Sequence, residues 1–361
     1  MQWTAEQDDA LKAVDRWMKA GDRQVFRLFG YAGAGKTTLA RHLAEHASGD
    51  VAFAAFTGKA AHVMRQKGCV GASTIHALIY RPASAESEDE PMFTIRRDAP
   101  AADADVIIID ECSMVDEELG KDLLSFGKPV LVLGDPAQLP PVKGGGFFTD
   151  TEPDFMLTEI HRQAADNPII RLSMAIRAGE EFDEHSEQCR IVSKREISTE
   201  EIMEADQILV GANRTRKRYN DRLRELREHT DDTPESGEKL VCLRNNKKKG
   251  LLNGGIWTVD RRMSPRGGRV RFTIRPEEGG KAVNVSTPRA FFLDGPETVP
   301  WAQRKGADEF DYGYALTVHK AQGSQWDNVV LFDESYMFRE HSRRWLYTGV
   351  TRAAQTLILV R

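Results

Sequence analysis

Segments with the hydrophobic period of a helix alternate along the chain with apolar segments typical of strands. Apolar residues with the spacing of a helix face follow Thr4, namely Leu11, Val14, Trp17 and Met18. They predict an opening amphipathic helix with Thr4 as its N-cap. Short apolar runs rich in β-branched residues come next, at residues 25–29, 51–56, 106–109 and 130–133, with a helix expected over residues 36–45. Because strands that alternate with helices form parallel sheets, we predict a doubly wound α/β domain.

The second half of the chain repeats this pattern around a segment of different character. Apolar runs at residues 207–211, 329–332 and 356–360 predict a second parallel sheet. Between Gly237 and about Ala307, short β-like pieces alternate with turn-forming glycine pairs such as Gly267-Gly268. This texture predicts a small β-barrel-like insertion. The expected domains are residues 1–180, residues 181–236 with 307–361, and the insertion at 237–306.

Composition narrows the class of protein. The chain has 361 residues, of which 29% are charged and 40% hydrophobic, as in a folded globular protein of about two domains. No stretch has the length and apolarity of a membrane span, so we expect a cytoplasmic protein without membrane association. The four cysteines are scattered and predict neither a zinc site nor disulfides.

The charge balance limits how nucleic acid could be bound. The net charge of −5 argues against binding through bulk basicity, so any nucleic-acid path must be local. Lysines and arginines do gather locally, at residues 214–227, 247–249 and 261–271. Each group alone is more often a solvated face of the protein than a binding surface.

The strongest chemical signal is a phosphate-binding loop. Residues 30–37 fit G-x-x-x-x-G-K-[ST] and lie between a predicted strand and a predicted helix. Backbone N–H groups of such a loop surround phosphates, Lys36 reaches the β and γ phosphates, and Thr37 binds Mg²⁺. The candidate nucleotide-binding residues are Gly30, Gly33, Gly35, Lys36, Thr37 and Thr38. The loop therefore predicts ATP and Mg²⁺ as cofactors.

Two carboxylates end the apolar strand at residues 106–109. Asp110 is placed to hold hydrated Mg²⁺ with Thr37, and Glu111 to orient or deprotonate the attacking water. An acidic pair at a strand end is common by chance, but beside a phosphate-binding loop it predicts hydrolysis rather than nucleotide binding alone.

Three further residues are candidates for the catalytic site. Gln138 follows the segment Gly134-Asp135-Pro136-Ala137 and could sense the γ-phosphate, although composition alone favours an ordinary turn with an exposed glutamine. Phosphoryl transfer also needs cations near the developing charge, for which Arg162 and Arg352 qualify. From spacing alone, either arginine could lie on the surface.

The order of these motifs resembles the superfamily 1 helicases of the RecD-like and Dda-like group. The resemblance spans nearly the whole chain and rests also on residues 4–7, 57–61, 73–76, 134–142 and 314–323 and on the segment around Arg352. It implies two RecA-like motor domains, a β-hairpin pin at about residues 77–104 in the first, and an SH3-like insertion in the second. It further implies that Gln7 reads the adenine edge and that Arg162 and Arg352 face the γ-phosphate.

The resemblance also implies an activity. The chain would be an ATP-dependent DNA helicase moving 5′ to 3′ on single-stranded DNA, with these strand-contacting residues: Thr57, Lys59, Thr74, His76, Phe93, Asn213, Arg214, Thr317 and His319. Phe93 is either a strand-separating wedge or a packed hairpin aromatic. Expected partners are single-stranded DNA, single-strand/duplex junctions, and single-strand-binding or replication and recombination factors. We expect a monomer, in a bacterium or a phage-infected cell.

Three other functions stay open on the residues. The chain could be a translocase without independent unwinding, acting as a motor subunit of a larger DNA-processing complex. It could be a nucleotide kinase that shares the phosphate-binding loop, although Glu111 beside Asp110 argues against that. It could also bind nucleic acid without catalysis, although every hydrolytic residue type is present. No cluster of carboxylates typical of a nuclease is visible.

Overall fold

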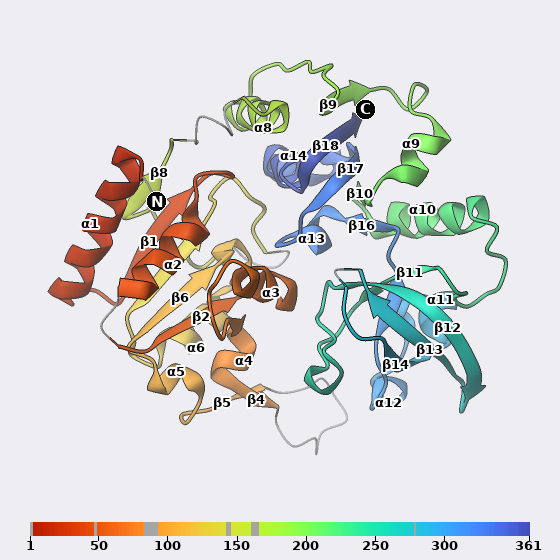
Figure 1. Ribbon diagram of the computed structural model, residues 1–361, viewed down its shortest axis with the longest axis horizontal. Coiled ribbons are helices and arrows are strands. Elements are labelled where there is room, and N and C mark those ends of the chain that lie inside the picture. The colour runs from red at the N-terminus through yellow and green to blue at the C-terminus, as the bar shows by residue number, and fades with distance from the viewer. Residues whose placement is uncertain (1–2, 47–48, 83–92, 142–145, 160–165, 278) are drawn as a thin grey trace. The chain divides into compact units, whose positions relative to one another are not determined.

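The computed structural model describes residues 3–46, 49–82, 93–141, 146–159, 166–277 and 279–361 (Figure 1). It divides into two compact units. The first contains the described residues of the ranges Met1–Ala83, Met92–Arg190 and Phe338–Thr351, and the second contains those of Ile191–Met337 and Arg352–Arg361. No helix among the described residues is long and apolar enough to cross a membrane.

The first unit is built on a six-stranded parallel sheet in the order β3-β2-β6-β7-β1-β8. Its strands are β1 Val25–Gly30, β2 Val51–Ala55, β3 Ser73–Thr74, β6 Val106–Asp110, β7 Val130–Gly134 and β8 Phe155–Leu157. Every residue of β6 and β7 is buried, because helices cover both faces. The four apolar runs predicted as strands are confirmed, whereas β3 and β8 are too short to give a periodic signal.

Alternate side chains of this sheet enter two different cores, as the strand period of two requires. Ile108 lies in one core, while its neighbours Ile107 and Ile109 lie in the other. The first core is closed by α1 Ala5–Ala20, α2 Lys36–His46 and α3 Gly58–Gln66, and the second by α4 Ile75–Ile79, α5 Pro100–Asp103 and α6 Glu117–Leu124. The predicted doubly wound α/β architecture is confirmed. Two more helices, α8 Pro168–Ala178 and α14 Ser342–Val350, also belong to this unit.

The second unit contains another parallel sheet. Its order is β16-β10-β17-β18-β9, with β9 Cys189–Val192, β10 Gln207–Val210, β16 Ala315–Thr317, β17 Trp326–Phe332 and β18 Ala353–Val360. β10 pairs parallel with both β16 and β17, and β17 pairs parallel with β18. The helices of this part are α9 Thr199–Glu204, α10 Asn213–Leu226 and α13 Val318–Ala321. The second predicted parallel sheet is therefore present.

An antiparallel sheet accompanies it, in the order β14-β13-β12-β11-β15. The strands are β11 Lys239–Cys242, β12 Ile256–Arg266, β13 Arg269–Pro276, β14 Val283–Pro288 and β15 Phe310–Tyr312, and the short helices α11 Ala290–Leu293 and α12 Trp301–Arg304 follow β14. Gly267 and Gly268 join β12 to β13 with φ values of 59° and 71°, the left-handed conformation that a tight hairpin turn requires. The predicted hairpin turn is confirmed.

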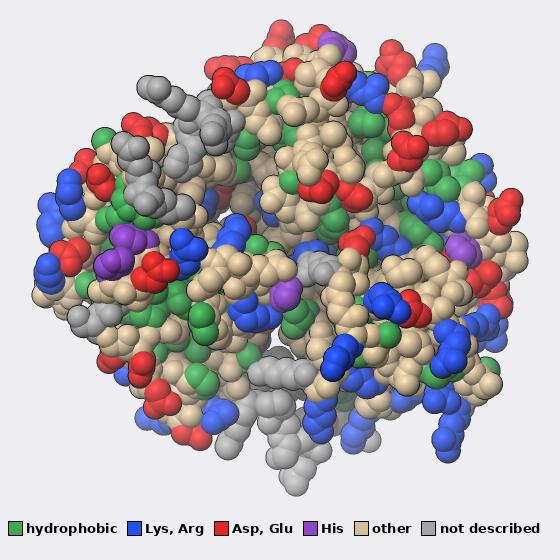
Figure 2. Space-filling model, viewed as in Figure 1, with side chains coloured by type: hydrophobic (Ala, Val, Ile, Leu, Met, Phe, Trp, Pro, Cys, Tyr) green, Lys and Arg blue, Asp and Glu red, His purple; other side chains and the backbone are tan. Residues whose placement is uncertain are grey.

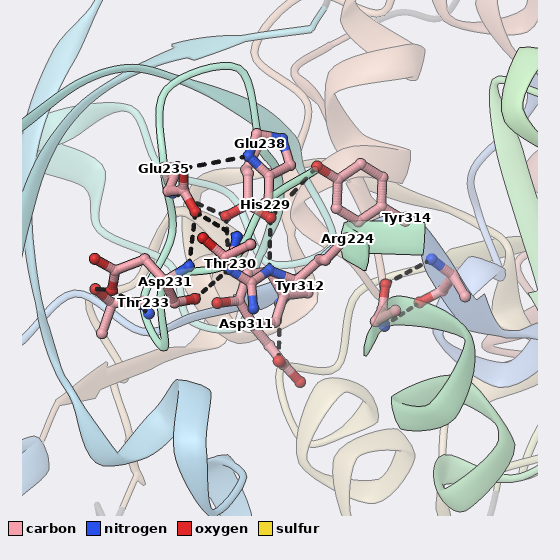
Figure 3. A network of polar contacts seen from close by, with 12 residues as sticks. Arg224, His229, Thr230, Asp231, Thr233, Glu235, Glu238, Asp311, Tyr312 and Tyr314 are labelled. Carbon is pink, nitrogen blue, oxygen red and sulfur yellow. Dashed lines mark hydrogen bonds and ion pairs between the residues drawn. The ribbon is translucent and has the colours of Figure 1, made fainter. Parts of the chain in front are cut away.

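A buried polar network ties α10 to this antiparallel sheet within the second unit (Figure 3). Arg224 of α10 donates from Nε and Nη2 to the two carboxylate oxygens of Glu238, at 2.7 and 3.1 Å, and lies over the ring of Tyr312. Glu238 is fully buried and also accepts the backbone N–H of Glu235. Because a bidentate partner and a backbone donor satisfy the carboxylate, its charge can be buried here.

The structure also bears on the predictions about the cysteines and about a hairpin in the first half of the chain. All four cysteines are free and buried in the structure. The short strands β4 Tyr80–Pro82 and β5 Phe93–Ile95 pair antiparallel in the region predicted to form a hairpin. The polar loop predicted at residues 83–91 lies outside the described residues, as does the side chain of Phe93.

Candidate active site

The phosphate-binding loop joins β1 to α2 in the first unit. A Cβ on Gly30 would lie 2.8 Å from the Cβ of Leu157 in β8, so only glycine allows the neighbouring strand to pack here. Gly33 and Gly35 have φ values of 83° and 79°, which curl the loop in a way that other residues resist. The Lys36 ammonium donates to the carbonyl oxygens of Gly30 and Tyr31, at 2.6 and 3.0 Å. The loop therefore holds its lysine over its own concave side.

The predicted metal ligands meet at the carboxyl ends of β1 and β6. The Thr37 hydroxyl donates to Asp110 Oδ2 at 2.9 Å, and Asp110 is only 8% exposed. Its other oxygen accepts the Glu111 backbone N–H, also at 2.9 Å. A hydroxyl and a carboxylate in contact are the oxygen donors that Mg²⁺ prefers. These two residues therefore fit the ion that the motif implies.

Glu111 has an unusual backbone conformation. Its φ of 54° and ψ of 47° lie in the left-handed region, which costs energy for a residue with a Cβ. The strained residue directly follows Asp110 at the end of the buried strand β6. Such strain commonly accompanies functional positions, and here it sets where the carboxylate leaves the strand.

Gln138 does not lie in an exposed turn. The residue is 7% exposed, and its backbone N–H donates to the carbonyl of Asp135. Its side-chain Oε1 is buried and makes no hydrogen bond to any residue that the structure describes. Buried polar atoms without a partner are rare, so this oxygen is suited to meet a ligand or water. The interpretation of Gln138 as a solvent-exposed turn residue was wrong, because the turn that follows β7 lies in the interior of the unit.

Tyr347 is a residue of the site that no sequence motif indicated. Its hydroxyl donates to Asp135 Oδ2 at 2.6 Å and accepts the Ala32 backbone N–H of the phosphate-binding loop at 3.1 Å. The side chain is 1% exposed, and burial raises the pKa of its hydroxyl well above the usual range. Since Asp135 and Gln138 share one loop, Tyr347 links that loop to the phosphate-binding loop. Because Tyr347 is distant in sequence from both loops, no local pattern indicated this role.

An arginine-lined pocket of about 270 Å³ opens beside the same loop. It is lined by Tyr31, Pro136, Ala137, Arg177, Arg343, Arg344 and Tyr347, all of the first unit. The Arg177 guanidinium stacks over the Tyr31 ring, 3.4 Å from its centroid. Positive charge therefore collects beside the phosphate-binding loop. Sequence reasoning missed Arg177, since helices α8 and α14 are brought together only by folding.

The structure describes only one of the two arginines that were predicted to lie near the γ-phosphate. Arg162 lies outside the described residues. Arg352 lies in the second unit, is 5% exposed, and donates from Nη1 to the carbonyl of Ser324 at 3.1 Å. Its burial excludes the surface arginine that spacing alone allowed. Its role toward the γ-phosphate stays a prediction.

Gln7 lies in the first helix and also contacts the phosphate-binding loop. It forms a capping box with Thr4, and its Nε2 donates to the carbonyl of Ala34 at 3.2 Å. The neighbouring Glu6 accepts hydrogen bonds from the backbone of Thr158 and Glu159. The N-terminal cap therefore fixes Gln7 beside the loop, where the sequence placed a nucleotide-reading residue.

The predicted strand-contacting residues of the first unit gather at one sheet edge. Thr57 and Thr74 are N-caps of α3 and α4, accepting the N–H groups of Ala60 and Ala77 at 3.1 Å each. Thr57 follows β2 and Thr74 ends β3, and these two strands are adjacent and parallel. Lys59 lies in the first turn of α3, and His76 in that of α4. Burial lowers the pKa of His76, so its ring is neutral near pH 7 and can donate or accept a hydrogen bond.

The second unit repeats this geometry. Thr317 is the N-cap of α13 at the end of β16, with His319 in the first turn, and Asn213 begins α10 after the adjacent parallel strand β10. A pocket of about 250 Å³ at the start of α10 is lined by polar and basic residues, among them Asn213, Arg214 and Lys217, and by Phe291. In each unit, the predicted residues converge where parallel strands end, which is the usual place for ligands in such sheets.

Comparisons with known families agree with this architecture. Residues 2–194 match the model of the AAA domain, and residues 312–360 match that of the UvrD-like helicase C-terminal domain. The ATP-dependent RecD2 DNA helicase of Deinococcus radiodurans is 31% identical over 365 residues, covering 92% of this chain and 46% of that protein. The ATP-dependent DNA helicase dda of Enterobacteria phage T4 is 32% identical over 194 residues, which cover 49% of this chain and 43% of that protein.

A solved structure shares the fold along almost the whole chain. The structure of Bacteroides Pif1 bound to single-stranded DNA has a TM-score of 0.62 at 20% identity, covering 99% of this chain and 92% of that one. The chain spans less than half the length of the RecD2 and dda proteins.

Proposed function

The chain belongs to the superfamily 1 helicases of the RecD, Dda and Pif1 group, and from this premise we propose that it is an ATP-dependent DNA helicase. The observation that carries the proposal is the contact of Thr37 with Asp110, beside Lys36 and the strained Glu111. This arrangement supports hydrolysis, since it joins a phosphate-binding loop to a metal-binding carboxylate and a base. A nucleotide kinase would not need Glu111 in that place.

Each residue has a defined part in the proposed reaction. Backbone N–H groups of residues 33–37 and the N-terminus of α2 bind the phosphates, and Lys36 moves from the loop carbonyls to the γ-phosphate. Thr37 and Asp110 would hold Mg²⁺, which would supply positive charge to the phosphoryl oxygens. Glu111 accepts a proton from the attacking water. The buried Oε1 of Gln138 supports a role in sensing that water or the phosphate.

The nucleotide is proposed to couple two motor domains. We assign residues 1–180 to the first RecA-like domain and residues 181–236 with 307–361 to the second, with an SH3-like insertion at 237–306. This assignment differs from the two compact units at Phe338–Thr351, which is part of the first unit. Gln7 would read adenine, while Arg162 of the first domain and Arg352 of the second would both bind the γ-phosphate. Hydrolysis then releases that contact. The two parallel sheets and the antiparallel sheet support this division.

The DNA strand would be held at the sheet edges that carry Thr57, Thr74 and Thr317. The helices that begin at these sheet edges carry further predicted contact residues in their first turns. This placement supports contacts with the DNA backbone in both units. The residues are Lys59, His76, Asn213, Arg214 and His319. The short pair of β4 and β5 supports a hairpin pin that carries Phe93. We propose 5′ to 3′ movement. Single-strand-binding, replication and recombination factors remain predicted partners.

Strand separation on forked DNA tests this function. The chain is given duplexes with either a 5′ or a 3′ single-stranded tail, with ATP and Mg²⁺, and displaced strand and released phosphate are both measured. We expect unwinding of the 5′-tailed duplex alone, and none by Lys36→Ala. The matched control, Lys19→Ala, removes an exposed lysine of α1 and retains activity.

Two other results would change the proposal. DNA-stimulated phosphate release without strand displacement from either fork would favour a translocase that acts within a larger complex. Absence of DNA-stimulated phosphate release would exclude a DNA motor.

A further inference from the structure

The antiparallel sheet carries a strongly basic surface. Lysine and arginine side chains gather over β12 and β13 in the space-filling view, although the chain as a whole has a net charge of −5 (Figure 2). Several arginines of this surface lie on two paired strands, namely Arg261, Arg266, Arg269, Arg271 and Arg275. We call this surface the basic face.

Strand pairing puts these arginines on one side of the sheet. Val270, Phe272 and Ile274 of β13 are buried in the core, so the alternate residues of that strand point away from it. Arg271 lies opposite Met263 of β12 and Ser286 of β14. In the same way, Arg266 lies opposite Arg269, and Arg261 lies opposite Thr273. Since directly opposed residues share a face, the arginines form one continuous surface.

Part of this charge has no counter-charge in the described chain. Arg275 pairs with Asp260 at 2.8 Å, and Arg269 donates to the carbonyl oxygens of Gly306 and Lys305. The nearby Arg262 and Arg289 pair with Asp231 and Asp232. In contrast, Arg261, Arg266 and Arg271 make no ion pair with any described residue.

Repulsion among these arginines indicates an external partner. Arg261 and Arg271 are diagonal neighbours on paired strands, a spacing of roughly 7–8 Å. Arg266 directly opposes Arg269, and like charges in directly opposed positions destabilise a sheet. An anionic partner would remove this repulsion. A regular row of phosphates fits the row of arginines better than a single small anion does.

We propose that the basic face binds the phosphate backbone of duplex DNA, a contact that rests on the proposed helicase function. The paired positions of this face include Thr273, Asn284 and Ser286, whose polar groups suit phosphate and sugar oxygens. None of the described residues that the pairing puts on this face is aromatic, whereas proteins that bind single strands stack bases on aromatic rings. The proposed single-strand contacts lie elsewhere, at the ends of parallel strands. The basic face therefore holds the duplex next to the motor.

Charge reversal on the face tests the proposal. Arg261→Glu with Arg271→Glu is compared with the wild type for binding a blunt duplex, by fluorescence anisotropy over a range of salt concentrations. We expect affinity to fall on the order of ten-fold and the salt slope to decrease by about 2, one unit for each lost phosphate contact. Arg261→Lys with Arg271→Lys keeps the charge and should retain most of the affinity. Lys194→Glu with Arg195→Glu changes the net charge equally at exposed positions outside the face and should leave binding nearly unchanged.

Phosphate release stimulated by single-stranded DNA separates this inference from the proposed function. The charge-reversed variant should keep that activity, and thermal unfolding should show an unchanged or raised midpoint. If this variant binds duplex DNA with the affinity and salt slope of the wild type, the proposed role of the basic face is refuted. Equal loss of single-strand stimulation would assign the face to the single strand instead and would also overturn the proposal. If the wild type lacks DNA-stimulated hydrolysis, the helicase function fails, while the duplex measurement still tests the face.

Discussion

Glu111 combines a strained backbone with a position beside the metal-binding carboxylate. In Glu111→Gln, the side chain keeps its size and can still orient water, but it no longer accepts a proton. We expect phosphate release to fall by about 100-fold or more, with nucleotide affinity nearly unchanged. Single-turnover phosphate release and binding of a fluorescent ATP analogue measure the two quantities.

A control for this change lies on α6. Glu118→Gln removes an exposed carboxylate of the first unit and should leave turnover unchanged. Near-normal turnover in Glu111→Gln would remove Glu111 from the role of base.

Tyr347 is a positioning residue, because it touches the loops around the site and not the reacting atoms. Tyr347→Phe removes the hydrogen bonds to Asp135 and Ala32. Because the bond to the carboxylate is charge-assisted and buried, we expect the free energy of unfolding to fall by about 1–3 kcal/mol. The turnover number should decrease more than nucleotide affinity, since the loop that carries Gln138 loses its link to the phosphate-binding loop. Urea unfolding and steady-state kinetics measure these effects.

The raised pKa of Tyr347 adds a second readout. The hydroxyl stays protonated throughout the neutral range, so the kinetic loss in Tyr347→Phe should be equal at pH 6 and pH 9. Tyr336→Phe, at a side chain that is 74% exposed, is the matched control. Unchanged kinetics in Tyr347→Phe would mean that the two loops keep their positions without this bond.

At the scale of elements, the site depends on where helices begin. Thr4, Thr57, Thr74 and Thr317 each cap a helix through the side-chain oxygen. Thr74 and Thr317 end parallel strands and Thr57 lies just after one, so these three capping threonines lie at the sheet edges proposed to bind DNA. The same local chemistry that ends a strand and starts a helix therefore also places polar groups at a binding edge.

The cap of α1 gives a prediction at this scale. Thr4→Ala removes the acceptor of the Gln7 N–H and one half of the capping box. The free energy of unfolding should decrease by about 0.5–2 kcal/mol. The Michaelis constant for ATP should rise as well, because Gln7 loses the helix end that fixes it. Thr4→Ser keeps the hydroxyl and should behave like the wild type in chemical unfolding and kinetics. A stable Thr4→Ala with unchanged ATP dependence would contradict this account.

At the scale of the whole molecule, each unit keeps its own core and its own buried polar contacts. The first unit holds the phosphate-binding loop between two apolar cores. The second joins a parallel and an antiparallel sheet through the network of Arg224, Glu238 and Tyr312. Damage to that network should therefore affect the second unit without removing the nucleotide site.

Arg224→Met tests this separation. The change leaves Glu238 as a buried carboxylate without its bidentate partner, which should cost about 3–5 kcal/mol of stability. Addition of Glu238→Leu removes the unpaired charge and should restore part of that loss. Calorimetry and denaturant unfolding give the stabilities, and a fluorescent ATP analogue reports the nucleotide site, whose affinity should be retained. Equal stability of Arg224→Met and the wild type would show that the network carries little of the fold.

The sequence by itself determined the local features of this protein. Strand and helix periods, the threonine cap of α1 and the glycine turn of the β12–β13 hairpin all depend on residues close together in the chain. The same holds for the pair Lys36-Thr37 and for the pair Asp110-Glu111, each taken by itself. The tertiary structure alone decided that Gln138 is buried, that Tyr347 bonds the phosphate-binding loop, and that Arg177 meets Arg343 and Arg344 in one pocket. The arginines at residues 261–275 were visible as a charge run, but only strand register put them on one face. Local periodicity fixes elements, whereas contacts between distant residues depend on how those elements pack.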